Sequence, residues 1–134
     1  MESVLCPTAD ERRPARRSNG YPRRRPCHAQ RVLVAMFARA TSRHIGANAC
    51  WLITLIAAQE AANQYAGPCE FFDHELMPLA GARNRYALDA WRRAAVRAGW
   101  LHYEPAGDSS HGDSSPAIYW TNIPSDDATE GRVP

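Results

Sequence analysis

Hydrophobic and polar positions change their spacing along the chain, and each change predicts a separate element. Residues 31–46 hold a short apolar run, which predicts a helical segment that ends near Gly46. Residues 47–67 are apolar on almost every side in their first two thirds, as expected for a helix buried in the middle of a small domain. Gly67-Pro68 then ends this helix, because neither residue readily continues a helical backbone. The last turns of the predicted helix become polar, with Gln59, Glu60, Asn63 and Gln64.

A short strand and a short helix are predicted next. Residues 69–72, CEFF, are a short strand candidate. Asp73 is a good N-cap for a helix over residues 73–81, with Glu75 in its first turn. Pro78 should keep that helix short or kinked, since proline removes a helical hydrogen bond.

Residues 82–98 predict an amphipathic helix that follows a tight turn at Gly81. Its buried stripe is expected to contain Leu88, Trp91, Ala95 and Ala98. The opposite side carries Arg85, Tyr86, Asp89 and Arg93, with Arg92 and Arg97 on the flanks. Gly99 is the expected left-handed cap at the C-terminal end.

Two strands complete the predicted order. Residues 100–104 alternate like a strand, residues 117–123 are a second strand candidate, and the Gly/Ser-rich loop between them predicts a β-hairpin. The expected fold is therefore mainly α with a small β-hairpin, an α+β class with three to four helices and a sheet of two or three strands. The expected core aromatics are Trp51, Trp91, Trp100 and Trp120, with Tyr103 and Tyr119.

The length of 134 residues is enough for one domain with tails. Residues 1–30 combine Arg, Pro, Ser and Gly, which predicts a disordered arm. Residues 31–124 are then the folded domain, and residues 125–134 a disordered acidic tail. The arm could hold phosphates electrostatically, or it could result from an upstream start codon, because Met36 stands just before the folded part.

The mild formal net charge of +2 conceals an uneven distribution. Residues 1–31 contain eight arginines against three acidic residues, whereas residues 105–134 contain one arginine against five. All 16 basic residues are arginine. This bias has two explanations: a GC-rich genome, or a use for the bidentate contacts that guanidinium makes with phosphate and guanine.

The cysteines have no metal-binding spacing. A zinc site formed by Cys6, Cys27 and His28 would lack an evident fourth ligand, so we expect no metal and no disulfide framework. The arginines before residues 32–38 imitate a secretory signal, but Arg39 lies inside the supposed cleavage motif. We therefore expect an intracellular, cytoplasmic protein without a membrane span.

Enzyme motifs are missing. The stretch HELMP at residues 74–78 has Pro78 where a zinc-protease motif needs its second histidine. A phosphate-binding glycine loop, a carboxylate pair and a Ser-His-Asp arrangement are not recognisable either. We therefore expect no enzymatic activity, no cofactor and no small-molecule ligand.

A three-residue turn between two helices is the helix-turn-helix pattern, and the following hairpin extends it. The stretch HELMPLAGARNRYALDAWRRAAVRAGWLHYEP resembles the core of bacterial and phage winged helix-turn-helix proteins. Gly81 matches their turn glycine, and RAGWL matches the ending of their second helix. Residues 45–123 are also similar to small uncharacterised helix-turn-helix proteins of Planctomycetes.

The resemblance implies double-stranded DNA as the partner, with a possible homodimer. In winged-helix families the helix after the turn usually enters the major groove. The positions nearest the bases would be Arg83, Asn84, Arg85, Tyr86 and Asp89. Those nearer the phosphates would be Arg92, Arg93 and Arg97. The expected role is transcription regulation, or replication initiation for a plasmid, phage or mobile element.

Two other interpretations compete with DNA binding. Asp89 is four residues from Arg85 and from Arg93, so these three could simply form intrahelical ion pairs on a solvated surface. The hairpin loop contains Asp108 and Asp113, which suit a basic protein surface better than DNA. The alternative function is a protein-protein interaction module that dimerises or docks a partner.

Overall fold

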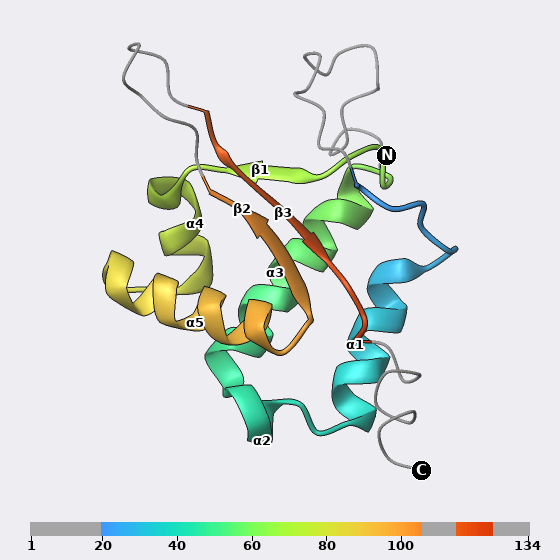
Figure 1. Cartoon of the computed structure of the whole chain (residues 1–134), viewed down its shortest axis with the longest axis horizontal. Helices are drawn as coiled ribbons and strands as arrows, with labels where there is room; N and C mark the ends of the chain where they lie inside the picture. Colours follow the sequence, from blue (N-terminus) through green and yellow to red (C-terminus); the bar gives the residue numbers. More distant parts are fainter. Residues whose placement is uncertain (1–19, 106–114, 125–134) are drawn as a thin grey trace.

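Residues 20–105 and 115–124 are described by the structure, which is a computed structural model. In these residues the chain forms five helices and one three-stranded antiparallel sheet (Figure 1). The elements are α1 (His28–Ala38), α2 (Ser42–Ile45), α3 (Ala47–Ala62), β1 (Cys69–Phe71), α4 (Asp73–Ala80), α5 (Arg85–Arg97), β2 (Leu101–Glu104) and β3 (Ala117–Thr121). The α+β class is therefore confirmed, with α2 as an additional single turn.

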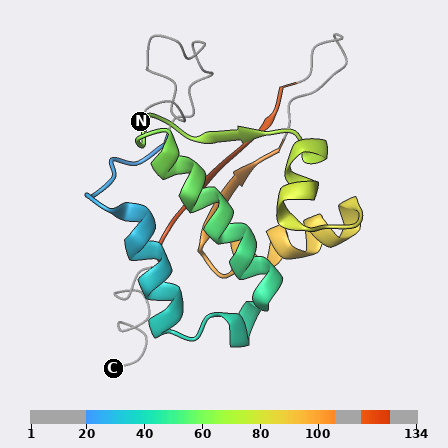
Figure 2. The same cartoon turned by 180° about the vertical axis from the view of Figure 1, so that it is seen from behind.

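Helix α3 is the centre of the domain. It packs across one face of the sheet, and α1 and α5 lie on either side of it (Figures 1 and 2). Its buried positions recur three and four residues apart, which is the spacing of one helix face. They are Ala49, Leu52, Ile53, Ile56, Ala57 and Glu60. The expected central helix is confirmed, but its predicted end at Gly67-Pro68 is wrong: α3 ends at Ala62, because Gln64 and Tyr65 adopt left-handed φ values of 58° and 55°. The carboxylate of Glu60 at the end of the buried face is an unexpected addition.

The sheet has the strand order β1-β3-β2, so β3 pairs with both neighbours. Cys69 of β1 lies opposite Tyr119, and Leu101 of β2 lies opposite Thr121. Every residue of β3 is buried, because this strand is central in the sheet and its inner face packs on α3. The predicted hairpin of β2 and β3 is confirmed, and β1 adds the third strand.

Most of the aromatic residues expected in the core are there, but Trp51 is not. Trp100, Trp120 and Tyr119 are buried, and Trp91 and Tyr103 are partly buried against the core. These two groups account for all but one of the six. The side chain of Trp51 is 48% exposed, and its Nε1 donates a hydrogen bond to the Leu79 carbonyl at 3.2 Å. The prediction was wrong here, because Trp51 lies at the outer side of α3 and bonds to the end of α4 instead of entering the core.

The domain begins earlier than the sequence predicted. Residues 20–27 precede α1 and pack against the domain, where the side chains of Tyr21 and Arg24 bond to Glu60. The predicted disordered arm is therefore wrong for residues 20–30, because a buried carboxylate holds this arginine-rich segment in place. Residues 1–19 and the predicted tail, 125–134, lie outside the described residues.

The helical segment predicted over residues 31–46 consists of two helices. Ala40 has a φ of 51°, in the left-handed region, and this turn separates α1 from α2. Thr41 directly after it is buried. The predicted end near Gly46 is confirmed, since Gly46 is the C-cap of α2 and has a φ of 94°.

The ends of α4 and α5 are defined by short-range contacts. Phe72, not the predicted Asp73, is the N-cap of α4, and the Phe72 N–H donates to Glu75 Oε1 at 2.9 Å. Pro78 lies inside this eight-residue helix, which is short as expected. Gly99 has the predicted positive φ of 91° after α5. Ala98 is exposed instead of buried, because α5 ends at Arg97.

Among the helices that the structure describes, none combines the length and apolar character needed to cross a membrane.

Candidate nucleic-acid interface

The N-terminus of α5 is fixed by a turn of four residues, 81–84. Gly81 ends α4 with a φ of 77°, a left-handed conformation that glycine adopts without steric cost. Asn84 is the N-cap of α5, and its Oδ1 accepts a hydrogen bond from the Ala87 N–H at 2.9 Å. Sequence analysis placed Asn84 near the bases. Its side-chain oxygen instead caps the N-terminal end of α5.

One side of α5 packs on the core. Leu88 and Ala95 are fully buried, and Trp91 between them is partly buried against the same cluster. These contacts fix the rotation of α5 relative to α3 and the sheet. The face opposite the core therefore has a defined orientation toward solvent.

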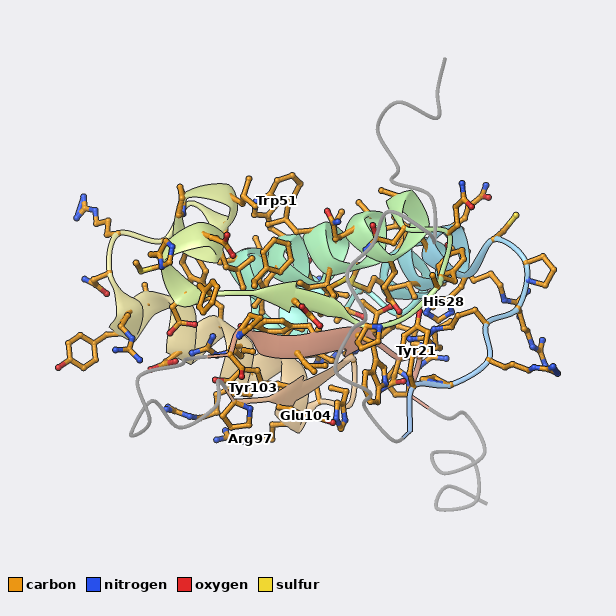
Figure 3. All side chains as sticks on the ribbon, turned by 90° about the horizontal axis from the view of Figure 1, so that it is seen from above. Tyr21, His28, Trp51, Arg97, Tyr103 and Glu104 are labelled. Atoms are coloured by element: carbon orange, nitrogen blue, oxygen red, sulfur yellow. The ribbon has the colours of Figure 1, made fainter. Side chains whose placement is uncertain are left out.

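Tyr86, Arg93 and Arg97 form the exposed stripe of α5. They follow a spacing of seven and four residues, which aligns side chains along one helix face. The side chain of Tyr86 is 84% exposed, and both arginines are exposed. Figure 3 shows Arg97 on the same side of the domain as Tyr103 of β2. Arg83 in the preceding turn is also exposed.

Arg92 lies away from this surface. Only 5% of it is exposed, and its Nη1 donates to Asp73 Oδ1 at 3.0 Å and to the Tyr119 hydroxyl at 2.7 Å. Its Nη2 donates to Asp89, and the guanidinium lies over the Tyr103 ring at 4.4 Å from the centroid. The expected phosphate contact does not fit this position, since the guanidinium already joins α4, α5 and the sheet.

The charge on Arg92 is held by its surroundings. Burial opposes the charged form, but the hydrogen bond to Asp73 and the interactions with Tyr119 and Tyr103 raise the pKa of Arg92 above its ordinary value. Burial also raises the pKa of Tyr119 to about 12. Arg92 and Tyr119 are therefore a cation and a neutral hydroxyl at every physiological pH.

The ion pairs of α5 differ from the predicted ones. Asp89 pairs with Arg92, three residues away, and Arg85 pairs with Asp73 of α4 at 3.2 Å. In the described part of the chain, Arg83, Arg93 and Arg97 have no ion-pair partner. Asp89 therefore neutralises a buried arginine and leaves the charge of the exposed stripe intact.

The acidic hairpin loop, with Asp108 and Asp113, lies outside the described residues. The strand before it is described. His102 of β2 stacks on Trp120 at 3.8 Å between ring centroids, and its Nε2 is 3.0 Å from Glu104 Oε2. This stack holds β2 against β3 next to the C-terminal end of α5.

Sequence analysis missed a buried polar cluster at the other side of the domain. Glu60 is fully buried, and its Oε2 accepts hydrogen bonds from Tyr21 Oη at 2.9 Å and Arg24 Nη2 at 2.8 Å. Its Oε1 accepts from the backbone N–H of Thr121 at 3.0 Å and from the hydroxyl of the same residue at 2.5 Å. His28 Nε2 lies 3.0 Å from that hydroxyl. Glu60 thereby joins the N-terminal segment, α3 and β3.

One signal in the sequence indicates this cluster. Glu60 is spaced four and three residues from Ile56 and Ala57, so it continues the apolar stripe of α3. A carboxylate on a buried stripe needs donors, and an arginine can supply both a donor and a charge. The pattern does not identify which arginine, because Arg39 and Arg43 are nearer to Glu60 in sequence than Arg24 is. Burial lowers the pKa of His28, and the charge of Arg24 lowers it further, so this imidazole is held neutral.

Metal ligands do not gather in the described ranges, where no group of three or more His, Cys, Asp and Glu residues could hold an ion. Cys27 is exposed, whereas His28 points to Thr121 in the interior. Cys6 of the imagined zinc site is outside these ranges.

Comparisons of the chain with protein-family models, with curated proteins and with solved structures gave no match.

Proposed function

We propose that this protein binds double-stranded DNA with the exposed stripe of α5, on a domain of the winged helix-turn-helix type. The observation that carries the proposal is a set of exposed arginines around α5 that have no ion-pair partner among the described residues. Arg93 and Arg97 extend along one exposed face with Tyr86, and Arg83 stands at the turn before it. The structural role of α5 uses Arg92 and Asp89, so this face is left for another molecule.

The order of elements supports the winged-helix part of the proposal. A central helix, α3, precedes β1, two helices joined by a short turn, and an antiparallel hairpin. β3 pairs with both other strands, so β1 and the hairpin form one sheet behind the two helices. In domains of this kind the second helix of the pair lies in the major groove. That helix is α5.

The chemistry of the stripe suits the phosphate backbone and base edges. Guanidinium groups bind phosphate oxygens in a bidentate manner and can read guanine through O6 and N7. Arg83 and Tyr86 lie at the N-terminal end of α5, where side chains reach the bases in such complexes. Arg93 and Arg97 lie further along and would contact phosphates. A role in transcription regulation or in replication initiation of a mobile element in the cytoplasm fits this kind of binding.

The test replaces Arg93 and Arg97 with glutamine and measures binding to a 20-base-pair duplex by fluorescence anisotropy. The loss of two phosphate contacts should weaken binding about tenfold or more at low salt. The plot of log K against log salt has a negative slope, and its magnitude should decrease by about 2. The control is the double variant Arg31→Gln/Arg43→Gln, which removes two exposed charges from α1 and α2. Equal losses in both double variants would mean that net charge, and not α5, accounts for the binding.

A second candidate function is self-association through α1. Leu33, Val34 and Phe37 are exposed on this helix, and the side chain of Phe37 is 88% exposed. An uncharged apolar patch can pair with the same patch of a second copy about a twofold axis, because no like charges then meet. Exposed apolar clusters of this kind usually mark interfaces. We propose a second copy of this chain as the occupant.

Replacing Phe37 with serine should convert the dimer to a monomer without unfolding it, because this ring contributes to no described core contact. The molar mass from light scattering after size exclusion is the measurement, at concentrations between 1 and 100 μM, a range chosen on the order of typical homodimer dissociation constants. Ala38→Ser, an exposed change at the next position of α1, is the matched control. A wild-type protein that stays monomeric across this range would exclude the second function.

A further inference from the structure

A second basic surface lies far from α5. It is a pocket of about 490 Å³ between the segment before α1 and the turn after α3. The lining residues are Tyr21, Pro22, Arg23, Arg24, Arg25, Pro26, Gln64 and Tyr65. Figures 1 and 3 show this segment at the opposite end of the domain from α5, with Tyr21 and His28 far from Arg97. The pocket is therefore independent of the DNA-binding surface proposed above.

The wall formed by residues 21–26 is anchored from below. Arg24 Nη2 donates to Glu60 Oε2 at 2.8 Å and to the Thr121 carbonyl at 2.7 Å. The guanidinium also lies over the Tyr21 ring, 5.0 Å from its centroid. Pro22 and Pro26 at the two ends fix their own φ angles and reduce the freedom of the segment. An arginine-rich stretch that would otherwise be extended in solvent is thus held in one conformation.

The opposite wall is also held in place. Gln64 and Tyr65 follow α3 with φ values of 58° and 55°, a left-handed conformation that residues other than glycine rarely adopt. The Tyr65 hydroxyl accepts a hydrogen bond from the Ala29 N–H at 2.9 Å, and the Tyr65 N–H donates to the Glu60 carbonyl. Conformations of this kind persist where the surroundings enforce them, and they concentrate at binding sites. The pocket is therefore preformed on both sides.

The described lining of the pocket is positively charged. Among the residues that the structure describes, the lining includes no acidic residue, and Glu60 beneath it pairs with Arg24. Arg23 and Arg25 are exposed and have no ion-pair partner within the residues described. The Arg24 side chain is 94% buried and belongs to the support of the wall. The described part of the site thus combines two exposed cations that have no ion-pair partner there with a third that holds them in place.

We propose that this pocket binds a phosphate group, carried either by a free nucleotide or by a nucleic-acid strand. Arg23 and Arg25 would donate hydrogen bonds to the phosphate oxygens, because the guanidinium group forms bidentate, charge-assisted hydrogen bonds with phosphate. A phosphate has enough oxygens to accept from more than one arginine. The Gln64 side chain on the other wall offers an amide donor.

Calorimetric titration of the full-length protein with ADP in low-salt chloride buffer tests the proposal, with adenosine as the probe that lacks phosphate. We expect saturable binding of ADP at one site and none of adenosine. In Arg23→Gln/Arg25→Gln, ADP should bind about tenfold more weakly or worse, because two charge-assisted contacts are lost. Arg25→Lys keeps the charge but loses the planar fork, and should fall between this variant and the wild type.

The double variant Arg93→Gln/Arg97→Gln separates the two sites. It should bind ADP like the wild type and bind duplex DNA more weakly, whereas Arg23→Gln/Arg25→Gln should show the larger loss with ADP. Displacement of ADP by a 12-nucleotide single strand would identify a nucleic-acid phosphate as the natural ligand, and failure of displacement would identify a free nucleotide. The proposal is overturned if ADP does not saturate the wild type, if adenosine binds equally well, or if Arg23→Gln/Arg25→Gln binds ADP unchanged. All four replaced arginines are exposed, so far-UV circular dichroism should show that each of the two double variants is folded.

Discussion

Replacing Glu60 with glutamine is expected to lower the free energy of unfolding by about 4 kcal/mol. This value lies within the range typical of buried ion pairs from which one partner is removed. Glu60 is fully buried and accepts hydrogen bonds from Tyr21, Arg24 and Thr121. Glutamine keeps the size of the side chain but puts an amide N–H₂ where one of the two oxygens accepts. Arg24, with a side chain only 6% exposed, then has no counter-charge.

Urea unfolding followed by tryptophan fluorescence measures this loss. Glu75→Gln is the control with the same chemical change, since an exposed glutamine can still accept the hydrogen bond from Phe72 N–H, and it should change stability by less than about 0.5 kcal/mol. The double variant Glu60→Gln/Arg24→Met should be less destabilised than the sum of the two single variants, because removing both charges leaves neither one bare. Additive losses would show that the two side chains act independently.

Much of the fold could be predicted because its determinants are local in sequence. The buried helix α3, the glycines after α4 and α5, and the pairing of β2 with β3 all follow from short-range patterns, and the structure confirms each of them. The start of the domain depends on a contact between residues far apart in sequence. Arg24 and Glu60 are 36 positions apart, and the composition around Arg24 is typical of a disordered segment.

The candidate DNA-binding surface was predictable in outline but not residue by residue. Helical spacing separates Leu88 and Ala95 from the arginines, and this division holds in the structure. It does not reveal which flank of α5 other elements cover. Arg92 and Arg93 are neighbours in sequence, yet Asp73 of α4 and Tyr119 of β3 enclose only Arg92. The distinction required the positions of α4 and the sheet, which the sequence pattern does not specify.

Replacing Arg92 with methionine is expected to lower the free energy of unfolding by about 3 kcal/mol, since it leaves buried polar groups without their partner. Tyr119 is fully buried and would lose the donor to its hydroxyl. Asp73 would keep only Arg85, and Asp89 would lose its partner, although both carboxylates are partly exposed and can be solvated. The guanidinium over the Tyr103 ring is replaced by a thioether, which also packs favourably on aromatic rings, so most of the loss comes from the hydrogen bonds and ion pairs.

Arg93→Met is the matched control one residue away, and the pair of variants separates structure from binding. Arg93 is exposed, so its replacement should change stability by less than about 0.5 kcal/mol and weaken duplex binding severalfold. Arg92→Met should instead reduce stability while its folded fraction, measured at 10 °C, binds duplex DNA with nearly wild-type affinity; that temperature is close to the roughly 10–20 °C at which domains are most stable. The reverse result, a stable Arg92→Met that no longer binds DNA, would place Arg92 at the DNA and contradict its assignment to the core. Because both variants remove one positive charge from α5, a change in net charge alone cannot produce this pattern.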